Sequence, residues 1–260
     1  MDARKLKVLF MVSAFNGLSQ KVWCELNFCY KQTELLIGVD AEVVEKIDPD
    51  LILCPFMKDY IPDRIWQHYP CLIVHPGPPD DGGPSSLNWA VLEDQKKWGI
   101  TVLQAEKGWD LGKILATAEF DLTEDSVSSI YRNEMADLTI QILPLAIENY
   151  FHKVTKIPKP KLKYKPAITQ KDLAFNWTEP TSGIMRKINA GDSTPGTQAL
   201  MQGQMFKLFG ASKGYRTGEP GEIIQISDEY IEIGTLDGSI RINRLDSEDG
   251  IKLRPSFFNL

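Results

Sequence analysis

Residues 7–54, KVLFMVSAFNGLSQKVWCELNFCYKQTELLIGVDAEVVEKIDPDLILC, decide the fold of this chain. Apolar strand-like runs alternate here with helix-like segments, in the order strand 8–12, helix 19–30, strand 35–39, helix 41–47 and strand 51–54. Such alternation is typical of βαβ units, which build a mostly parallel, Rossmann-like sheet flanked by helices. The sequence therefore predicts an α/β fold in which the strand ends at Ser13 and Cys54 lie on one edge of the sheet.

The next strand brings a titratable group to the same edge. Cys71–Val74 is a short apolar run, and Pro76, which cannot donate to a strand ladder, stops it just after His75. Because open α/β sheets bind ligands outside the carboxyl ends of their strands, His75 is well placed for catalysis. The tract that follows, PGPPDDGGP, combines prolines and glycines and predicts a shaped loop.

A second candidate side chain follows 35 residues after this histidine. A helix is predicted from Ser85 or Ser86 to Leu92, followed by a strand at 100–104. The loop after that strand holds Asp110 between two glycines, and we expect it to present the carboxylate toward the edge that carries the histidine. The spacing alone is also compatible with two residues that have no catalytic role. The aspartate can be an ordinary turn residue, and the histidine can be a structural residue that forms hydrogen bonds.

The pattern resembles the formyltransferase family that uses 10-formyltetrahydrofolate. That family carries Asn-x-His, a Pro/Gly-rich loop and a Gly-x-Asp-x-Gly loop, and His75 and Asp110 match it. The resemblance implies these two as the catalytic residues. The position of the family asparagine is occupied by Ile73, which cannot donate a hydrogen bond to a formyl oxygen. Loss of one oxyanion donor typically costs about 2.7 to 4 kcal/mol, a serious but not fatal loss.

Within the family, stretches along nearly the whole chain resemble the N-terminal half of the HypX/HoxX group of hydrogenase maturation factors. These stretches are SAFNGLSQKVWCEL, DPDLILCPFMKDYIP, SSIYRNE and DSTPGTQALMQGQMFKLFGA. The resemblance implies formyl transfer to the thiol of coenzyme A, giving formyl-CoA. It also implies, as partners, an enoyl-CoA-hydratase-like domain or protein that releases carbon monoxide, and other proteins of [NiFe]-hydrogenase maturation. A thiol acceptor reacts as a strong nucleophile and needs less help than an alcohol.

The resemblance and the predicted strand ends also give candidate binding residues. Those expected near folate are Cys54, Pro55, Phe56, Met57, Lys107, Gly108 and Trp109. Those expected near the acceptor are Asn16, Ser19, Gln20 and Arg132. The first three acceptor residues lie where a strand leads into a helix, a position that favours phosphate, although the full glycine fingerprint is missing.

Composition limits the other possibilities. Hydrophobic content of 43% and charged content of 25% are ordinary for a globular protein, and no apolar run is long enough to span a bilayer. The four cysteines match no zinc motif and only three histidines are present, so no metal is expected. The net charge of −6 argues against a nucleic-acid surface. We expect a cytoplasmic protein that acts on small molecules.

The remainder of the chain predicts a second domain. A long helix is expected over 126–153, with Pro144 inside it, and a Pro/Lys-rich linker at 154–166. Alternating polar and apolar residues follow, with a hairpin signal at Asp237-Gly238. We therefore predict a catalytic domain at 1–153 and a small open, OB-like β-barrel at 167–260, which the family resemblance also implies.

Two other functions remain as alternatives to formylation of a thiol. One is N-formylation of an amine on a sugar nucleotide or an aminoacyl-tRNA, against which the isoleucine at the asparagine position counts. The other is a folate- or CoA-binding module without catalysis, which the presence of both His75 and Asp110 disfavours.

Overall fold

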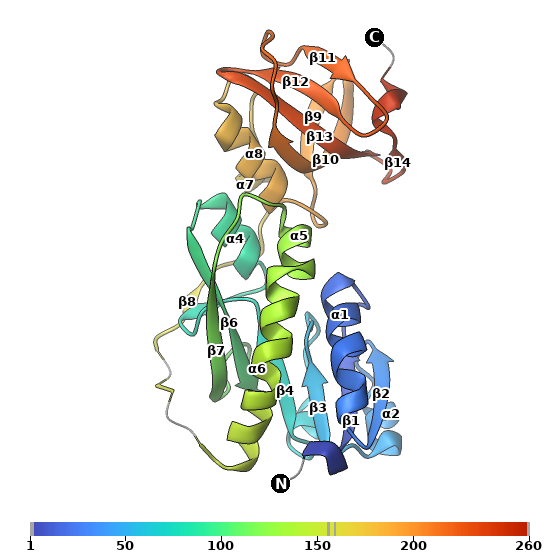
Figure 1. Ribbon diagram of the computed structural model, residues 1–260, viewed down its shortest axis with the longest axis vertical. Helices are drawn as coiled ribbons and strands as arrows, with labels where there is room; N and C mark the ends of the chain where they lie inside the picture. Colours follow the sequence, from blue (N-terminus) through green and yellow to red (C-terminus); the bar gives the residue numbers. More distant parts are fainter. Residues whose placement is uncertain (1–2, 155–156, 159, 259–260) are drawn as a thin grey trace. The chain divides into compact units, whose positions relative to one another are not determined.

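The computed structural model describes residues 3–154, 157–158 and 160–258, and its contacts divide the chain into two compact units (Figure 1). The first comprises Met1–Ser86, Lys97–Asp121 and Tyr131–Pro166, and the second comprises Leu87–Lys96, Leu122–Ile130 and Ala167–Leu260. The boundaries expected from the sequence treat each domain as one continuous segment, whereas the second unit also takes up two short pieces of the N-terminal part. Residues 155, 156 and 159 of the expected linker, and the ends at 1–2 and 259–260, lie outside the described residues.

A six-stranded sheet organises the first unit, with strand order β2-β1-β3-β4-β6-β7. Its strands are β1 (Lys7–Val12), β2 (Gln32–Ile37), β3 (Leu51–Cys54), β4 (Cys71–His75), β6 (Lys97–Gln104) and β7 (Ile114–Asp121). Strands β1 to β4 are parallel, and β6 and β7 are added antiparallel. The predicted mostly parallel sheet is confirmed, and β7 is an additional strand that the sequence analysis did not find.

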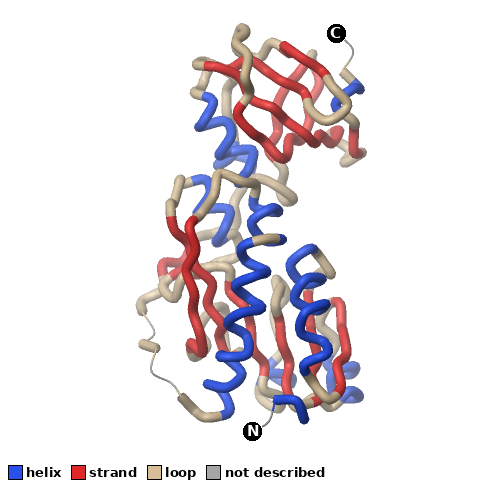
Figure 2. The backbone as a smooth tube through the Cα atoms, in the orientation of Figure 1, coloured by secondary structure: helices blue, strands red, loops and turns tan. Residues whose placement is uncertain are grey.

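Helices cover both faces of this sheet, as βαβ units require. The helices of the first unit are α1 (Gly17–Leu26), α2 (Ala41–Ile47), α3 (Asp63–Trp66) and α6 (Glu134–Phe151), with 3-10 turns η1 (Ala3–Lys5) and η2 (Asn27–Cys29). Two further helices, α4 (Ser86–Leu92) and α5 (Val127–Arg132), have most of their residues in the second unit. Alternate residues of β1 face opposite helices, because Met11 packs with Val44 of α2 while the ring of Phe10 lies 5.1 Å from that of Trp23 in α1. Helix α6 packs beside α1 and along β7 (Figure 2).

The long helix expected over 126–153 is two helices. The chain leaves helical geometry at Asn133, between α5 and α6, whereas Pro144 lies inside α6 without ending it. Among the residues that the structure describes, no helix combines the length and the apolar content that a membrane crossing requires.

The second unit is built on an antiparallel sheet with order β11-β12-β13-β10-β9, to which β14 adds along β13. Its elements are α7 (Gln170–Leu173), α8 (Thr181–Ala190), β9 (Thr197–Met201), β10 (Gln204–Lys213), β11 (Ile223–Ile226), β12 (Ile231–Thr235), β13 (Gly238–Ser247), β14 (Lys252–Leu253) and the 3-10 turn η3 (Pro255–Phe257). The hairpin predicted at Asp237-Gly238 is confirmed, since Thr235 pairs with Gly238 where β12 turns into β13. This is the small antiparallel domain that the sequence predicts.

Part of the expected linker is a strand. Residues Lys163–Tyr164 form β8, which pairs in parallel with β5 (Asp81–Gly82) of the Pro/Gly-rich loop. The backbone N–H of Lys163 donates to the carbonyl of Asp80 at 2.7 Å, and that of Lys165 to the carbonyl of Gly82 at 2.9 Å. The segment after α6 therefore holds the loop that follows His75.

Candidate active site

A cavity of about 350 Å³ lies at the carboxyl ends of β3 and β4. Its wall includes Pro55 and Phe56 after β3, His75 and Pro76 at the end of β4, and Tyr131 in the last turn of α5. The end of β1 supports this wall, because the hydroxyl of Ser13 accepts the backbone N–H of Lys58 at 2.6 Å. The cavity thus occupies the edge of the sheet at which α/β proteins bind their ligands.

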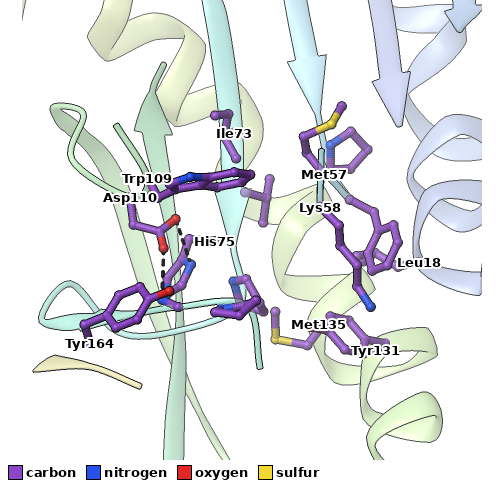
Figure 3. Close-up of a pocket in the computed structure, with 16 residues that line it drawn as sticks. Leu18, Met57, Lys58, Ile73, His75, Trp109, Asp110, Tyr131, Met135 and Tyr164 are labelled. Atoms are coloured by element: carbon purple, nitrogen blue, oxygen red, sulfur yellow. Dashed lines mark hydrogen bonds and ion pairs between the residues drawn. The ribbon is translucent and has the colours of Figure 1, made fainter. Parts of the chain in front are cut away.

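His75 and Asp110 meet in this wall. The Nδ1 atom of His75 lies 3.3 Å from Oδ1 of Asp110, and both residues line the cavity (Figure 3). The histidine side chain is 4% exposed and the aspartate side chain 18% exposed, so the aspartate is the more accessible of the two. The predicted meeting of the two side chains is confirmed, whereas their catalytic roles stay a prediction.

The path of the chain to Asp110 differs from the expected one. Strand β6 runs antiparallel to β4, so that its last residue, Gln104, pairs with Leu72 near the start of β4. The loop after β6 therefore begins away from His75 and folds back to reach it. Its backbone is unusual there, because Gly108 has a φ of 100° and Asp110 itself a φ of 53°, a conformation that a residue with a side chain rarely adopts.

Asp81 is a third member of the cluster that the sequence analysis missed. Its Oδ2 atom lies 3.1 Å from Nε2 of His75, and its carboxylate also contacts the hydroxyl of Ser86. The Asp81 side chain is buried, at 6% exposure. In the sequence it is the second of two adjacent aspartates in a loop rich in proline and glycine, where aspartate is an ordinary turn residue. Only its burial beside the imidazole distinguishes it from Asp80.

The charges of this cluster favour a protonated histidine. Burial alone lowers the pKa of His75, but the hydrogen bonds to Asp110 and Asp81, together with their negative charges, raise it to about 9. At neutral pH the ring is therefore an imidazolium whose two N–H groups point at two carboxylates. The backbone N–H of Gly83 also donates to Oδ2 of Asp110 at 3.0 Å, which fixes the second oxygen of that carboxylate.

The residues expected near folate divide into four sets. Those that line the cavity are Pro55, Phe56, Met57 and Trp109. Gly108 lines a smaller neighbouring cavity, and Lys107 is exposed and lines neither of the two. The side chain of Cys54 instead faces the core, with its sulfur 3.7 Å from that of Cys71. Tyr164, in the expected linker, also lines the cavity and was missed because its segment has the composition of a spacer.

The residues expected near the acceptor gather at the start of α1. Asn16 caps that helix by accepting the backbone N–H of Ser19, and the Ser19 hydroxyl is buried and donates to the carbonyl of Ala14 at 2.7 Å. Gln20 and Arg132 present exposed side chains. Arg132 also belongs to this cluster, since a Cβ atom on Gly17 would lie 3.0 Å from its Cγ atom. Asn16 and Ser19 therefore shape the helix start, and Gln20 and Arg132 remain accessible at it.

Ile73, at the position of the family asparagine, presents an apolar side chain to the cavity. It offers no hydrogen-bond donor there. Besides Tyr164, the polar side chains of Lys58 and Tyr131 line the same cavity, and neither was singled out from the sequence. Burial raises the pKa of the Tyr131 hydroxyl, as does the negative charge of Asp81. In the described part of the chain, no three His, Cys, Asp or Glu side chains gather in an arrangement that could hold a metal ion.

Comparisons with known proteins agree with this site and fold. The formyl transferase model matches residues 30–147, and the formyl transferase C-terminal domain model matches residues 167–259. Hydrogenase maturation factor HoxX of Bradyrhizobium diazoefficiens is 32% identical over 92% of this chain and 44% of its own. Methionyl-tRNA formyltransferase of Syntrophus aciditrophicus is 24% identical over 84% of this chain and 72% of its own.

Among solved structures, HypX from Aquifex aeolicus in complex with tetrahydrofolic acid superposes with a TM-score of 0.91 at 33% identity, over 97% of this chain and 46% of that one. The chain thus spans less than half of the length of HoxX and HypX. Both domain models match in order and together cover most of the sequence. The chain therefore belongs to the 10-formyltetrahydrofolate-dependent formyltransferase family and is similar to the N-terminal half of the hydrogenase maturation factors HypX and HoxX.

Proposed function

We propose that this chain transfers the formyl group of 10-formyltetrahydrofolate to the thiol of coenzyme A. The observation that carries the proposal is the contact between His75 and Asp110 in the wall of an apolar cavity at the carboxyl edge of the sheet. A folate can lie against Pro55, Phe56 and Trp109, with its formyl group at the carboxylate of Asp110. Relatives that carry the same two domains include a HypX solved with tetrahydrofolic acid.

The proposed reaction needs a carboxylate that can hold a proton. The sulfur of the acceptor bonds to the formyl carbon, the bond from that carbon to folate N10 breaks, and the thiol proton ends on N10. Asp110 is the accessible carboxylate of the cluster and takes this proton first, returning it to the departing nitrogen. His75 orients Asp110 and keeps positive charge next to it throughout the transfer.

The choice of a thiol acceptor is supported by what the cavity lacks. Ile73 stands where the general family has a hydrogen-bond donor, and a thiolate attacks a formyl carbon without strong activation. Coenzyme A also carries phosphates, and Gln20 and Arg132 lie exposed at the N-terminus of α1, where helix N–H groups favour anions. N-formylation of an amine is the second candidate, since methionyl-tRNA formyltransferases are among the relatives.

The wider role that we propose is carbon monoxide supply for [NiFe]-hydrogenase maturation. The name of HoxX gives a role in hydrogenase maturation for that protein, and the chain spans less than half of the length of HoxX and HypX. A separate protein or domain of the enoyl-CoA hydratase kind would then release carbon monoxide from formyl-CoA.

One assay tests the activity and the acceptor together. The chain is mixed with 10-formyltetrahydrofolate and either coenzyme A or candidate amines, and the products are identified by mass spectrometry. We expect formyl-CoA and tetrahydrofolate in equal amounts, and the loss of both with His75→Ala, which should still bind tetrahydrofolate. Formylated amine without formyl-CoA would replace the acceptor, tetrahydrofolate formed with water alone would make the chain a deformylase, and no turnover with retained folate binding would make it a binding module.

A further inference from the structure

Asp110 has a backbone conformation that needs support from its neighbours. Its φ of 53° is rarely adopted by a residue with a side chain, and such conformations persist only where the surrounding structure holds them. Two contacts fix its carboxylate: Oδ1 lies 3.3 Å from Nδ1 of His75, and Oδ2 accepts the backbone N–H of Gly83 at 3.0 Å. The carboxylate therefore cannot rotate away from the imidazole without losing the hydrogen bond to Gly83.

The peptide group between Gly82 and Gly83 contacts Asp110 on one side and the segment of β8 on the other. Its N–H, from Gly83, donates to Oδ2 of Asp110, and its carbonyl, from Gly82, accepts the backbone N–H of Lys165 at 2.9 Å. Because a peptide group is planar, fixing its carbonyl also fixes the direction of its N–H. Hydrogen bonds in such a chain also polarise one another. A bond made by the segment after α6 therefore sets how this loop donates to Asp110.

The space around this peptide group admits only glycine at position 83. Gly83 has a φ of 120°, and a Cβ atom there would lie 2.0 Å from the carbonyl oxygen of Lys165. Glycine alone combines such a conformation with so close an approach of two backbones. On the neighbouring residue, a Cβ atom on Gly82 would lie 3.7 Å both from Oδ2 of Asp110 and from Cδ1 of Leu162. The loop thus lies between Asp110 and the segment that contains β8.

Strand β5 is too short to hold this loop in place alone. It has two residues, and in the part of the chain that the structure describes it pairs with β8 in a sheet of two strands. The ion pair between Lys163 and Asp80 is at the surface, where such pairs add little. The backbone hydrogen bonds of Lys163 and Lys165 are therefore the firmer link. Both residues lie between 147 and 167, outside the two family models that match this chain.

We propose that the Gly82–Gly83 peptide group is a positioning element of the proposed active site, and that β8 holds it so that Asp110 stays against His75 during formyl transfer. The inference deepens the proposed function and rests on it for the role of Asp110. The peptide group keeps its proton throughout and acts only on the orientation of the carboxylate, which takes the thiol proton and returns it to N10. Figure 3 shows Tyr164, of β8, on the same side of the cavity as His75 and Asp110.

The test removes one backbone donor by substituting proline, which has no N–H. Lys165→Pro removes the hydrogen bond to the carbonyl of Gly82, and Lys165→Met keeps that bond while it removes the ammonium group. We expect Lys165→Pro to lower kcat about 10- to 100-fold, because a misplacement of about 1 Å at a reacting group costs up to about 100-fold. The Kd for tetrahydrofolate should change less than kcat does, and Lys165→Met should behave as the unaltered protein does.

A second proline on the same strand is the matched control. Lys163→Pro removes the hydrogen bond to the carbonyl of Asp80. The peptide group of that carbonyl carries the N–H of Asp81, which donates to the carbonyl of Pro78 at 3.0 Å and not to Asp110. Lys163→Pro should therefore lower kcat much less than Lys165→Pro does. Equal losses in the two variants would mean that β8 only braces the whole loop, and would overturn the proposal. A raised Kd with unchanged kcat in Lys165→Pro would overturn it as well, since β8 would then only cover folate.

A titration without substrate separates this inference from the proposed function. The hydrogen bond to Asp110 contributes to the raised pKa of His75, so a carboxylate that moves away should lower that pKa from about 9. The ¹⁵N shifts of the imidazole, followed against pH, should show this fall in Lys165→Pro and not in Lys163→Pro or Lys165→Met. If no formyl group is ever transferred, the proposed function fails while this titration still decides the inference. An unchanged titration in Lys165→Pro would overturn it.

Hydrogen exchange in the unaltered protein decides the question if Lys165→Pro does not fold. Release of β8 should release the peptide group as well, so the amide protons of Lys165 and Gly83 should exchange with equal free energies of opening. A Gly83 amide that stays protected while that of Lys165 exchanges would show that β8 does not hold it, and the proposal would be wrong.

Discussion

The Oδ2 atom of Asp81 lies 3.1 Å from Nε2 of His75, and Oδ1 of Asp110 lies 3.3 Å from Nδ1, so both ring nitrogens of this histidine contact a carboxylate. A His–Asp pair with one free nitrogen can accept or release a proton at that nitrogen, as in acid–base catalysis. Here the second nitrogen is occupied as well. The consequence is an imidazolium that acts as a fixed positive charge next to Asp110, and the charge depends on two carboxylates.

Removing the charge of Asp81 should therefore be visible at His75. In Asp81→Asn the side chain keeps an oxygen but loses its negative charge, so we expect the pKa of His75 to fall from about 9 toward its usual range. The ¹⁵N and ¹H shifts of the imidazole, followed by NMR against pH, measure this directly. A fall of kcat on the order of tenfold at pH 8 should accompany it, because each pH unit of pKa corresponds to about 1.4 kcal/mol.

The neighbouring aspartate is the matched control. Asp80 pairs with Lys163 at the surface, at 2.6 Å, so Asp80→Asn removes the same charge one residue away without touching the imidazole. The two variants should differ in the titration of His75. An unchanged titration in Asp81→Asn would show that Asp110 alone holds the proton on the ring.

The same pKa predicts how stability depends on pH. The folded-state pKa of His75 is raised above the value of 6.5 for the unfolded chain, so its contribution is fully present below pH 6.5 and is lost as the pH rises through about 9. A pKa difference of this size corresponds to roughly 3 kcal/mol. Urea unfolding between pH 6 and 10 should show this loss in the unaltered protein and not in His75→Gln. Lys58, whose pKa is lowered by burial, also lines this wall, but it is common to both proteins.

Much of the fold was predictable because the sequences of the core strands have a clear strand pattern. Strands β3 and β4 are short, continuous apolar runs, and both helices expected between β1 and β3 are present. Strand β7 was not predicted. Its first three residues are buried, its remaining residues alternate between exposed and partly buried, and it follows a glycine-rich loop. The break at Asn133 was also hidden, because the apolar spacing continues across it.

The site was predictable only where a local motif marks it. His75 ends a strand before a loop rich in glycine and proline, and Asp110 lies between two glycines. Asp81, Lys58 and Tyr164 instead owe their places to long-range contacts. Gly77 shows how tightly these contacts are packed. A Cβ atom there would lie 2.5 Å from Oδ2 of Asp81 and 2.6 Å from Nε2 of His75, and sequence alone gives no sign of such a constraint.

The buried carboxylate of Glu232 predicts a stability effect in the second unit. Burial raises its pKa, but hydrogen bonds from Ser239, from the backbone N–H of Tyr215 and from Arg241 lower it to about 2. Its contribution is thus present above pH 4.5 and is lost as the pH falls through about 2. We expect Glu232→Gln to lower the free energy of unfolding at pH 7 by about 1 to 3 kcal/mol, since donors are left poorly paired.

Tryptophan fluorescence can follow this change, because Trp177 packs against the core of the second unit. Glu229→Gln, at an exposed position two residues before β12, is the control and should leave the unfolding curve in place. Equal stability of Glu232→Gln and the unaltered protein at pH 7 would contradict a charged carboxylate at this position.

Tyr164 predicts that the segment after α6 takes part in folate binding. It is exposed by 65% yet lines the cavity, and β8 holds it there by pairing with the loop at Asp81–Gly82. A large aromatic ring at the mouth of an apolar cavity can cover a flat ligand, a contact worth about 0.5 to 1.5 kcal/mol. Tyr164→Ala should therefore raise the Kd for tetrahydrofolate about 2- to 10-fold, measured by calorimetry, and Tyr164→Phe should not. Tyr215→Ala, which removes an exposed tyrosine of the second unit, controls for the loss of a surface ring. If Tyr164→Ala binds folate as the unaltered protein does, the segment only braces the loop, and its effect should then appear in kcat through His75 rather than in affinity.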